Sequence, residues 1–418
     1  MKMLLKALSF ILVSSSSLLV ISCTNNKPSS SQNINSNTMN ANTRNNNNNN
    51  NNNNQNQPNM INDQREKNKR DLTEEEKQTI NDIFTNQQDA FATFHNYQDV
   101  VDQLQVFLAD KGLNEVILAR PEEKNKTLDL DESGAKNSVK VRVFGNEFEF
   151  KPKTVKDTVE TKYSDNKKEK AIQLGYKKQT EGNINYYVLN KLDENIKEVP
   201  IHLPLKVNSL KESFKDLKND KVENIDKWDT KNIVSLSSMF SDAKKFNQNL
   251  SSWNVSNVKN MSHIFSGAES FNSKLDGWDV SKVTDMESMF DGAFSFNQNL
   301  NNWKTKSLKN LTSTFREAKK FNQPLEKWDV SNVTIMEGTF SDAISFNQDL
   351  SSWKTNNVGT MNGMFSGATS FKQDLKKWNV EKVGNAQNFA KDIKDNLPKE
   401  KLPKFREAYS EDKYIYGK

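Results

Sequence analysis

The chain has 418 residues, a hydrophobic content of 34% and a formal net charge of +5. This length has room for two or more domains, and the low hydrophobic content indicates that part of the chain builds no packed core. The mild charge argues against nucleic-acid binding, and the single cysteine excludes an internal disulfide framework and a cysteine-rich metal site.

Residues 1–22 have the pattern of a lipoprotein signal peptide. Lys2 and Lys6 flank the start of an apolar run over 7–22, which is shorter than the about 20 residues of a membrane-spanning helix. The run ends in V-I-S-C, which resembles the bacterial lipobox and implies that Cys23 is diacylated and starts the mature protein. We therefore expect a lipid anchor on the outer face of the cell membrane; the alternative is an uncleaved anchor helix with an incidental thiol.

Residues 23–70 are expected to form an Asn-rich, disordered tether. They contain an unbroken asparagine run over 45–54, and such a composition cannot bury enough apolar surface to offset the entropy of ordering. The tether would hold the folded part away from the bilayer. The alternative is that asparagine codons accumulated by drift in an A/T-rich genome.

Residues 71–204 are expected to form a small α+β region. Thr73 and Glu76 make a capping box at the start of a first helix, and a second apolar stripe over 97–108 predicts its partner in a helical hairpin. A membrane-surface role for the stripes is the alternative. We expect strands next, with Gly145-Asn146 as a hairpin turn, so that Val143 would pair with Phe148 and Val141 with Phe150.

A second hairpin is expected to join residues 171–178 to 184–192, with 151–170 as a charged linker between the hairpins. The apolar content of these strands is small. They are therefore predicted to form a minor sheet that leans on the next region.

Residues 205–390 contain a repeat of 25 residues, the sign of a solenoid or repeat array. The unit reads L-x-x-W-x-V/T-x-x-V-x-x-M-x-x-x-F-x-x-A-x-x-F-N-Q-x. Its spacing predicts a short strand at L-x-x-W-x-V and a short helix at M-x-x-x-F-x-x-A in each coil. All seven tryptophans stand in this register: Trp228, Trp253, Trp278, Trp303, Trp328, Trp353 and Trp378.

These motifs resemble the Bacteroides-surface-protein-A-like leucine-rich repeats, in the 25-residue version found in mycoplasma surface lipoproteins. The resemblance covers under half of the chain. It implies a right-handed, leucine-rich-repeat-like solenoid outside the cell and no catalytic residue. Val207, Leu210 and Phe214 imitate the repeat in more polar surroundings, as expected of an N-terminal cap, and residues 391–418 are expected to form a C-terminal capping helix.

The repeated Trp and Asn columns invite a ligand interpretation, but their period favours structure. Each Trp shares a face with a Val in most coils, so it is assigned to the core. The asparagines are interpreted as turn residues that bond the backbone of neighbouring coils, with Lys372 breaking the series. This series is Asn247, Asn272, Asn297, Asn322 and Asn347.

No motif supports catalysis, and we expect neither an enzyme nor a cofactor nor a metal site. His95, His202 and His263 stand far apart, and the chain has no H-E-x-x-H, G-x-S-x-G, P-loop or C-x-x-C pattern.

The exposed positions beside each Trp vary from coil to coil, which is how solenoids present binding surfaces. The alternative is that these positions are simply solvated. The candidate binding face comprises Lys304, Lys354, Lys376, Lys377, Asp276, Asp279 and Asp329.

The sequence therefore predicts a monomeric, lipid-anchored surface protein that contacts host or extracellular macromolecules, protein or matrix, through its solenoid. An antigenic or protective coat lipoprotein with no dedicated ligand is the alternative. A solute-binding lipoprotein of a transporter is disfavoured, because no two-lobed α/β pattern surrounds a cleft.

Overall fold

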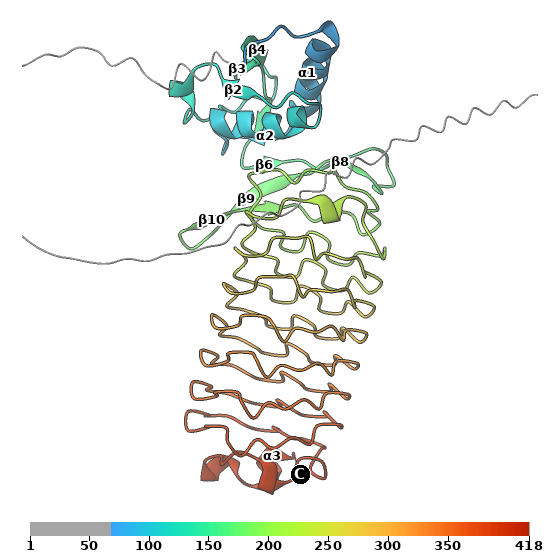
Figure 1. Cartoon of the computed structure of the whole chain (residues 1–418), viewed down its shortest axis with the longest axis vertical. Coiled ribbons are helices and arrows are strands. Elements are labelled where there is room, and N and C mark those ends of the chain that lie inside the picture. The colour runs from blue at the N-terminus through green and yellow to red at the C-terminus, as the bar shows by residue number, and fades with distance from the viewer. Residues whose placement is uncertain (1–67, 418) are drawn as a thin grey trace, which may run out of the picture. The chain divides into compact units, whose positions relative to one another are not determined.

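The computed structural model describes residues 68–417 (Figure 1). The expected signal peptide, Cys23 and residues 23–67 of the expected tether lie outside the described residues. The helices are α1 (Glu74–Gln87), α2 (Tyr97–Ala109) and α3 (Asp412–Ile415), with 3-10 turns η1 (Pro121–Glu123), η2 (Ile225–Lys227), η3 (Lys399–Lys401) and η4 (Glu407–Tyr409). The strands are β1 (Phe91–Ala92), β2 (Val116–Leu118), β3 (Val139–Val143), β4 (Asn146–Phe150), β5 (Thr154–Val155), β6 (Thr158–Val159), β7 (Lys162–Tyr163), β8 (Ala171–Gln173), β9 (Tyr176–Glu181) and β10 (Ile184–Leu189).

The two expected helices form, and the capping box starts the first one. The Glu76 N–H donates to Thr73 Oγ1 at 3.1 Å, and the Thr73 N–H donates to the Glu76 carboxylate at 2.9 Å. Asn96 and Asp99 exchange the same two bonds at the start of α2, both at 2.9 Å. Both helix starts are therefore fixed by local side-chain bonds, independently of tertiary contacts.

The first hairpin forms with a different register from the expected one. Val141 pairs with Phe148, and Val143 pairs with Asn146. The turn residues are Phe144 and Gly145, with φ angles of 45° and 79°, as a two-residue type I′ turn requires. The expected turn was one residue too late, which shifts every pair by two residues and keeps the same side chains on one face.

The expected charged linker over 151–170 is wrong, because it contains three short strands. β5 pairs with β1, β6 with β9, and β7 with β8. The second hairpin forms, with Glu181 opposite Ile184 across a two-residue turn, but its first strand is β9 alone, because residues 171–173 form β8 and pair with β7. Non-local partners give these short, charged segments their strand structure, so their own composition did not reveal it.

Residues 151–203 pack with the repeats, whereas residues 72–150 mostly pack among themselves. Val159, Tyr176 and Leu189 belong to the hydrophobic core that runs through the repeats. A second core holds Ile80, Leu104 and most other buried residues of α1, α2 and the β2-β3-β4 sheet. The expected minor sheet is therefore divided: the second hairpin shares the core of the repeats, whereas the first hairpin, β3–β4, belongs to the second core.

The repeats contain little regular secondary structure. Between 228 and 398 the described chain has no helix and no strand longer than a single bridge, so the expected short helix is wrong. Backbone N–H groups here alternate between two kinds of partner. The Phe240 N–H donates to the Ile264 carbonyl of the next coil at 2.9 Å, whereas the Met239 N–H donates to the Leu236 carbonyl of its own coil at 3.1 Å.

Two residues of each such segment adopt a positive φ, which a helix interior does not tolerate. Ser238 has a φ of 54° and Asp242 a φ of 60°. The same two columns contain Gly267, Gly292, Gly338, Gly363 and Gly367, all with positive φ. The chain therefore advances through consecutive turns, and cross-coil bonds replace the i→i−4 bonds of a helix.

Successive coils are joined by a ladder of single parallel bridges, and the residue that each coil contributes lies seven positions after its Trp. The expected strand at L-x-x-W-x-V is therefore misplaced, because the residues flanking each Trp form turns. The bridges run through Ser209, Ser235, Asn260, Asp285, Asn310, Ile335, Thr360 and Asn385. Figure 1 shows the coils lying one after another from the yellow-green to the red part of the chain.

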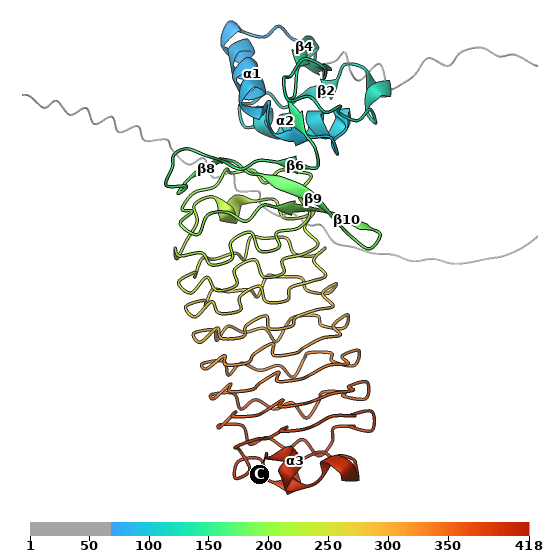
Figure 2. The same ribbon diagram turned by 180° about the vertical axis from the view of Figure 1, so that it is seen from behind.

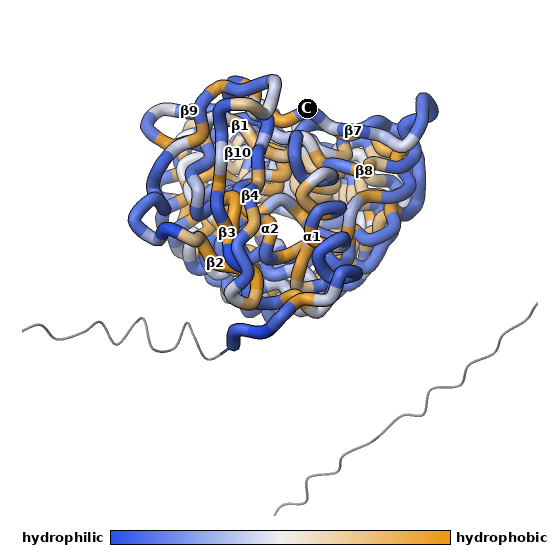
Figure 3. The backbone as a smooth tube through the Cα atoms, turned by 90° about the horizontal axis from the view of Figure 1, so that it is seen from above, coloured by the Kyte–Doolittle hydropathy of each residue, from blue (hydrophilic) through white to orange (hydrophobic). Residues whose placement is uncertain are grey.

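The repeated aromatic residues fill the interior of the coils. Phe290 stacks on Phe265 at 5.9 Å and on Phe296 at 3.9 Å between ring centroids. The Trp278 Nε1–H donates to the Leu250 carbonyl at 3.0 Å, and every other Trp donates to a carbonyl 28 residues earlier in the same way. The Trp column is thus core, as expected. In Figure 3 hydrophilic residues dominate the outside of the coils.

Both ends of the repeat array are covered by less regular chain. Phe214 stacks on Phe240 at 5.5 Å, so the coil expected as the N-terminal cap continues the aromatic column. The expected capping helix over 391–418 is wrong, because only η3, η4 and the four-residue α3 form there (Figure 2). The Ala390 N–H donates to the Ile415 carbonyl at 3.0 Å, which satisfies part of the last coil's open edge.

Candidate interaction surface

The candidate binding residues are all exposed, but they lie in turns or between two turns and not on the ladder. They flank the buried tryptophans, whose side chains are only 2–3% exposed. One column, at the position after the Trp, gathers four of them in consecutive coils: Asp279, Lys304, Asp329 and Lys354. Asp276, Lys376 and Lys377 lie on the other side of the Trp, and Asp276 is 100 residues, or four coils, from Lys376.

Opposite charges alternate along the column that holds Lys304. The hydrogen bond from Ser281 lowers the pKa of Asp279, and the charge of Lys304 lowers it further. Asp329 has the same arrangement, with Ser331 as the hydrogen-bond donor and Lys354 as a nearby positive charge. These aspartates therefore hold turns and neutralise their lysine neighbours, so the column has mixed charge rather than one sign.

The two remaining lysines also lie near carboxylates. Lys376 forms an ion pair with Asp374 at 3.0 Å. The pKa of Asp349 is lowered by the Ser351 N–H that it accepts and, in addition, by the charge of Lys377. Not every position beside a Trp faces solvent: Asn301, two residues before Trp303, is 7% exposed and its Oδ1 accepts the Lys327 N–H at 3.0 Å, so it belongs to the structure of the turn.

The asparagine series forms the expected ladder. Asn297 Oδ1 accepts the Asn322 N–H and the Gln323 Nε2–H, both at 3.0 Å. The Lys372 N–H donates to Asn347 Oδ1 at 3.1 Å, and Lys372 provides no amide oxygen for a further rung. These side chains bond the backbone of the following coil, so they do not form a ligand track.

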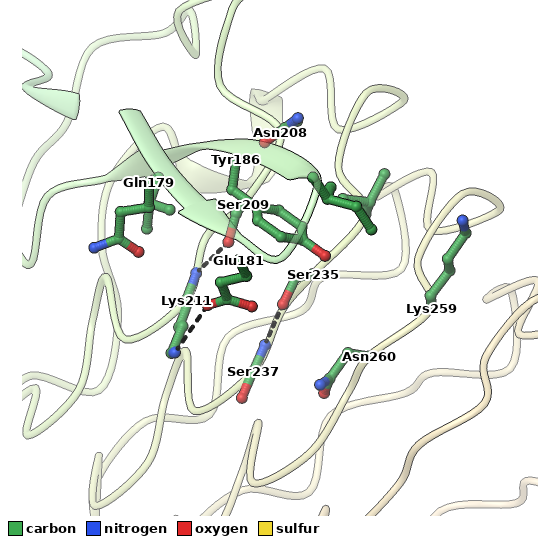
Figure 4. A pocket seen from close by; sticks show the side chains of 13 residues that line it. Gln179, Glu181, Tyr186, Asn208, Ser209, Lys211, Ser235, Ser237, Lys259 and Asn260 are labelled. Atoms are coloured by element: carbon green, nitrogen blue, oxygen red, sulfur yellow. Dashed lines mark hydrogen bonds and ion pairs between the residues drawn. The ribbon is translucent and has the colours of Figure 1, made fainter. Parts of the chain in front are cut away.

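The sequence did not reveal a groove beneath the β9–β10 hairpin. It is a cavity of about 290 Å³, lined by hairpin side chains, among them Gln179, Glu181 and Tyr186, and by ladder residues of the first coils. Figure 4 shows Tyr186 from the hairpin and Ser235 from the ladder on facing sides of it. The alternation of β10 was visible in the sequence, but its position over the ladder depends on tertiary structure.

A second cavity, of about 270 Å³, lies between α2 and the chain on both sides of the first Trp, at residues 205–206 and 231–232. Asp99 and Lys206 form an ion pair there at 2.8 Å, and each side chain is about one quarter exposed. His95 is buried, and Tyr176 Oη lies 2.9 Å from its Nε2. Burial lowers the pKa of His95 to about 4, so the ring is neutral near neutral pH.

The structure gives the three histidines different surroundings. His202 bonds Asp110, and His263 lies 3.7 Å from Glu287. Within residues 68–417, no cluster of three or more His, Cys, Asp or Glu side chains is arranged to hold a metal ion. A search of the same residues finds no helix with the length and apolar character to cross a membrane.

Comparison with known proteins finds one family that the repeats match. Residues 208–320 and 298–400 match the model of a family described as "Mycoplasma protein of unknown function, DUF285". No curated protein and no solved structure matches the chain. The region from 208 to 400, with its buried aromatic residues every 25 positions, is thus similar to this mycoplasma family.

Proposed function

We propose that this chain is a lipid-anchored bacterial surface protein and that its repeats form a leucine-rich-repeat-like solenoid that binds macromolecules outside the cell. One observation carries the proposal: the core columns are constant, whereas the exposed columns beside them differ in charge from coil to coil. Position 304 is Lys where 279 and 329 are Asp, although the neighbouring Trp is invariant. A scaffold needs only the constant columns, and variation confined to the surface suits recognition.

The parallel bridges between consecutive coils support the solenoid, and the resemblance to leucine-rich repeats of mycoplasma surface lipoproteins supports the location. The V-I-S-C sequence before position 24 supports the lipid anchor. In cells fed labelled palmitate, the wild-type chain should carry label and sediment with membranes, and Cys23→Ser should do neither. A labelled Cys23→Ser protein would rule out this anchor.

Binding is tested with the full chain on intact host cells and on matrix proteins. The test variant reverses the four lysines of the candidate face to Glu. The control variant makes the same charge change at four exposed lysines of the preceding region, namely Lys111, Lys124, Lys156 and Lys177. Exposed charges contribute roughly 0.5 kcal/mol each, so the test variant should bind about thirtyfold more weakly while the control binds normally.

Equal weakening in both variants would show nonspecific charge attraction and contradict the assigned face. Absence of binding by wild-type protein with native tryptophan fluorescence would leave the coat role as the function for those hosts.

A further inference from the structure

We propose that the groove beneath the β9–β10 hairpin binds a neutral monosaccharide or disaccharide. The inference deepens the proposed function and rests on it only for the location of the groove outside the cell. The groove is distinct from the charged face beside the tryptophans, because it lies at the first coils of the ladder.

The hairpin is fixed at one end and overhangs the coils at the other. Val188 forms a parallel bridge with Ser209, and the Leu189 N–H donates to the Ser209 carbonyl at 3.0 Å. The Tyr187 carbonyl accepts the Asn208 N–H at 3.1 Å. From there to the turn after Glu181 the hairpin diverges from the ladder, and the cavity of about 290 Å³ opens between them.

The floor of the groove offers hydrogen-bond donors in regular steps. Neighbouring coils supply Ser209, Ser235 and Asn260 at ladder positions about 4.8 Å apart, and Ser235 and Asn260 are the more accessible donors because Ser209 is only 2% exposed. Each side-chain oxygen already accepts a protein N–H: Ser209 from Lys211 at 3.3 Å, Ser235 from Ser237 at 3.4 Å. Among the described residues, their hydroxyl protons have no acceptor.

The asparagines of the floor likewise have an occupied acceptor oxygen and free donor groups. Asn208 Oδ1 accepts the Tyr187 N–H at 2.8 Å, and Asn260 Oδ1 accepts the Ser262 N–H at 2.8 Å. Their amide NH₂ groups have no partner within the described chain. The floor therefore presents donors to the oxygen atoms of a ligand, while Gln179 and Glu181 in the roof provide acceptors for its hydroxyl protons.

Tyr186 supplies the apolar surface that a sugar ring needs. Its side chain is half-buried, and Figure 4 shows the ring reaching over the floor toward Ser235. Ile184 at the rim is 57% exposed. An aromatic ring with a polar tip pairs with one apolar face of a pyranose while the sugar hydroxyls remain free for the floor.

Charge and size favour a small neutral ligand over other classes. Glu181 lies 3.7 Å from Lys211, so the pair offsets its own charge, and Lys259 alone does not make an anion site. The volume is near the lower limit of about 300 Å³ for ligand pockets, and the many polar lining groups disfavour a lipid.

An extended peptide would need an open strand edge. Tyr187 and Leu189 already bond the ladder, and by alternation only Asn185 has its backbone groups facing outward before the turn. One residue of free edge does not hold a peptide strand.

The test measures binding of soluble disaccharides of glucose, galactose, mannose and N-acetylglucosamine to the full chain by saturation-transfer NMR and calorimetry. At least one should bind saturably, with a dissociation constant on the order of 1 mM or tighter. Tyr186→Ala should weaken this binding at least about tenfold, whereas Tyr186→Phe, which keeps the ring, should stay within about threefold of wild type. Tyr414→Ala, an exposed tyrosine at the other end of the repeats, is the matched control and should bind normally.

No binding of any disaccharide by folded protein, an unchanged Tyr186→Ala variant, or an equal loss in Tyr414→Ala would overturn the proposal. Binding of extended peptides that Tyr186→Ala abolishes, with no sugar binding, would assign the groove to protein instead. Cell binding that survives Tyr186→Ala and fails with the lysine reversals would leave the proposed function standing without this sugar site.

Discussion

The region over 72–150 and the repeats achieve stability by opposite routes. The first builds helices and an antiparallel sheet whose hydrogen bonds lie within each element or between sequence neighbours, such as β3 and β4. The repeats form almost no regular element, and about half of their backbone bonds run to residues about 25 positions away. A coil of this kind is not stable alone, because half of the backbone N–H groups in its turns donate to carbonyl groups of the next coil.

The comparison shows that a short stretch with helical spacing does not have to form a helix. M-x-x-x-F-x-x-A places its apolar side chains inward whether the backbone is helical or forms consecutive turns. The neighbouring coil offers carbonyl groups at every second residue, as it does for Phe240, and those bonds replace the helical ones.

The largest effect is expected from emptying one core at a time. Phe290→Ala and Phe150→Ala each remove a ring that is at most 1% exposed and should cost about 3–5 kcal/mol. All seven tryptophans lie in the repeats, so urea unfolding followed by tryptophan fluorescence reports the repeats, and far-UV circular dichroism reports mainly α1 and α2. Phe290→Ala should shift mainly the fluorescence transition, and Phe150→Ala mainly the dichroism transition. Equal shifts of both signals in both variants would show one cooperative unit.

The second largest effect is expected from acid, which should weaken the connection between the two regions. His95 comes from the first region and Tyr176 from the core of the repeats. The folded pKa of His95 is about 4 against 6.5 for the free group, so between these values the unfolded chain binds a proton that the folded chain does not. The free energy of unfolding should therefore fall as the pH falls from 6.5 to 4, by at most about 3 kcal/mol.

The measurement is a series of urea titrations between pH 7 and pH 4. His95→Gln should flatten the slope over this range, with Asp99 and Lys206 nearby left unchanged. An unaltered slope in this variant would assign the acid sensitivity to other groups.

A smaller effect should come from the positive φ positions. Gly363 has a φ of 59° and space for a methyl group, so Gly363→Ala adds only backbone strain and should lower the free energy of unfolding by about 1 kcal/mol. Ser313 occupies the same column with a φ of 51°, and Ser313→Gly should be stabilising or neutral. Thermal unfolding of the two variants measures the difference. A helical segment would predict the reverse order.

The smallest effect is expected from the asparagine ladder. Asn297→Ala removes one acceptor from two donors at a partly exposed position, where water replaces much of the loss, and should cost about 0.5 kcal/mol. Asn356→Ala is the control, since this exposed side chain has no bond to any residue of the described chain. Matching urea midpoints in the two variants would show that the asparagine ladder does not stabilise the repeats.

The candidate site was predictable only in part. The sequence located the exposed positions beside each Trp, because a residue between two core columns at a fixed period faces outward. The period placed Asp279 and Lys304 in adjacent coils, but it did not show that their charges are close enough to offset each other, since that depends on how the coils are aligned. The groove under the hairpin has contributions from residues as far apart as Gln179 and Asn260, and no spacing rule connects them.

The sequence by itself determined the period, the buried columns and the helix starts, because burial follows from hydrophobic spacing and Thr73 and Glu76 bond each other locally. Only the tertiary structure decided the backbone of each coil, the position of the ladder seven residues after the Trp, and the strands over 154–163. The physical reason is the same in all three cases. Their backbone groups bond partners that are distant in sequence, and local preference gives no information about a partner that folding brings near.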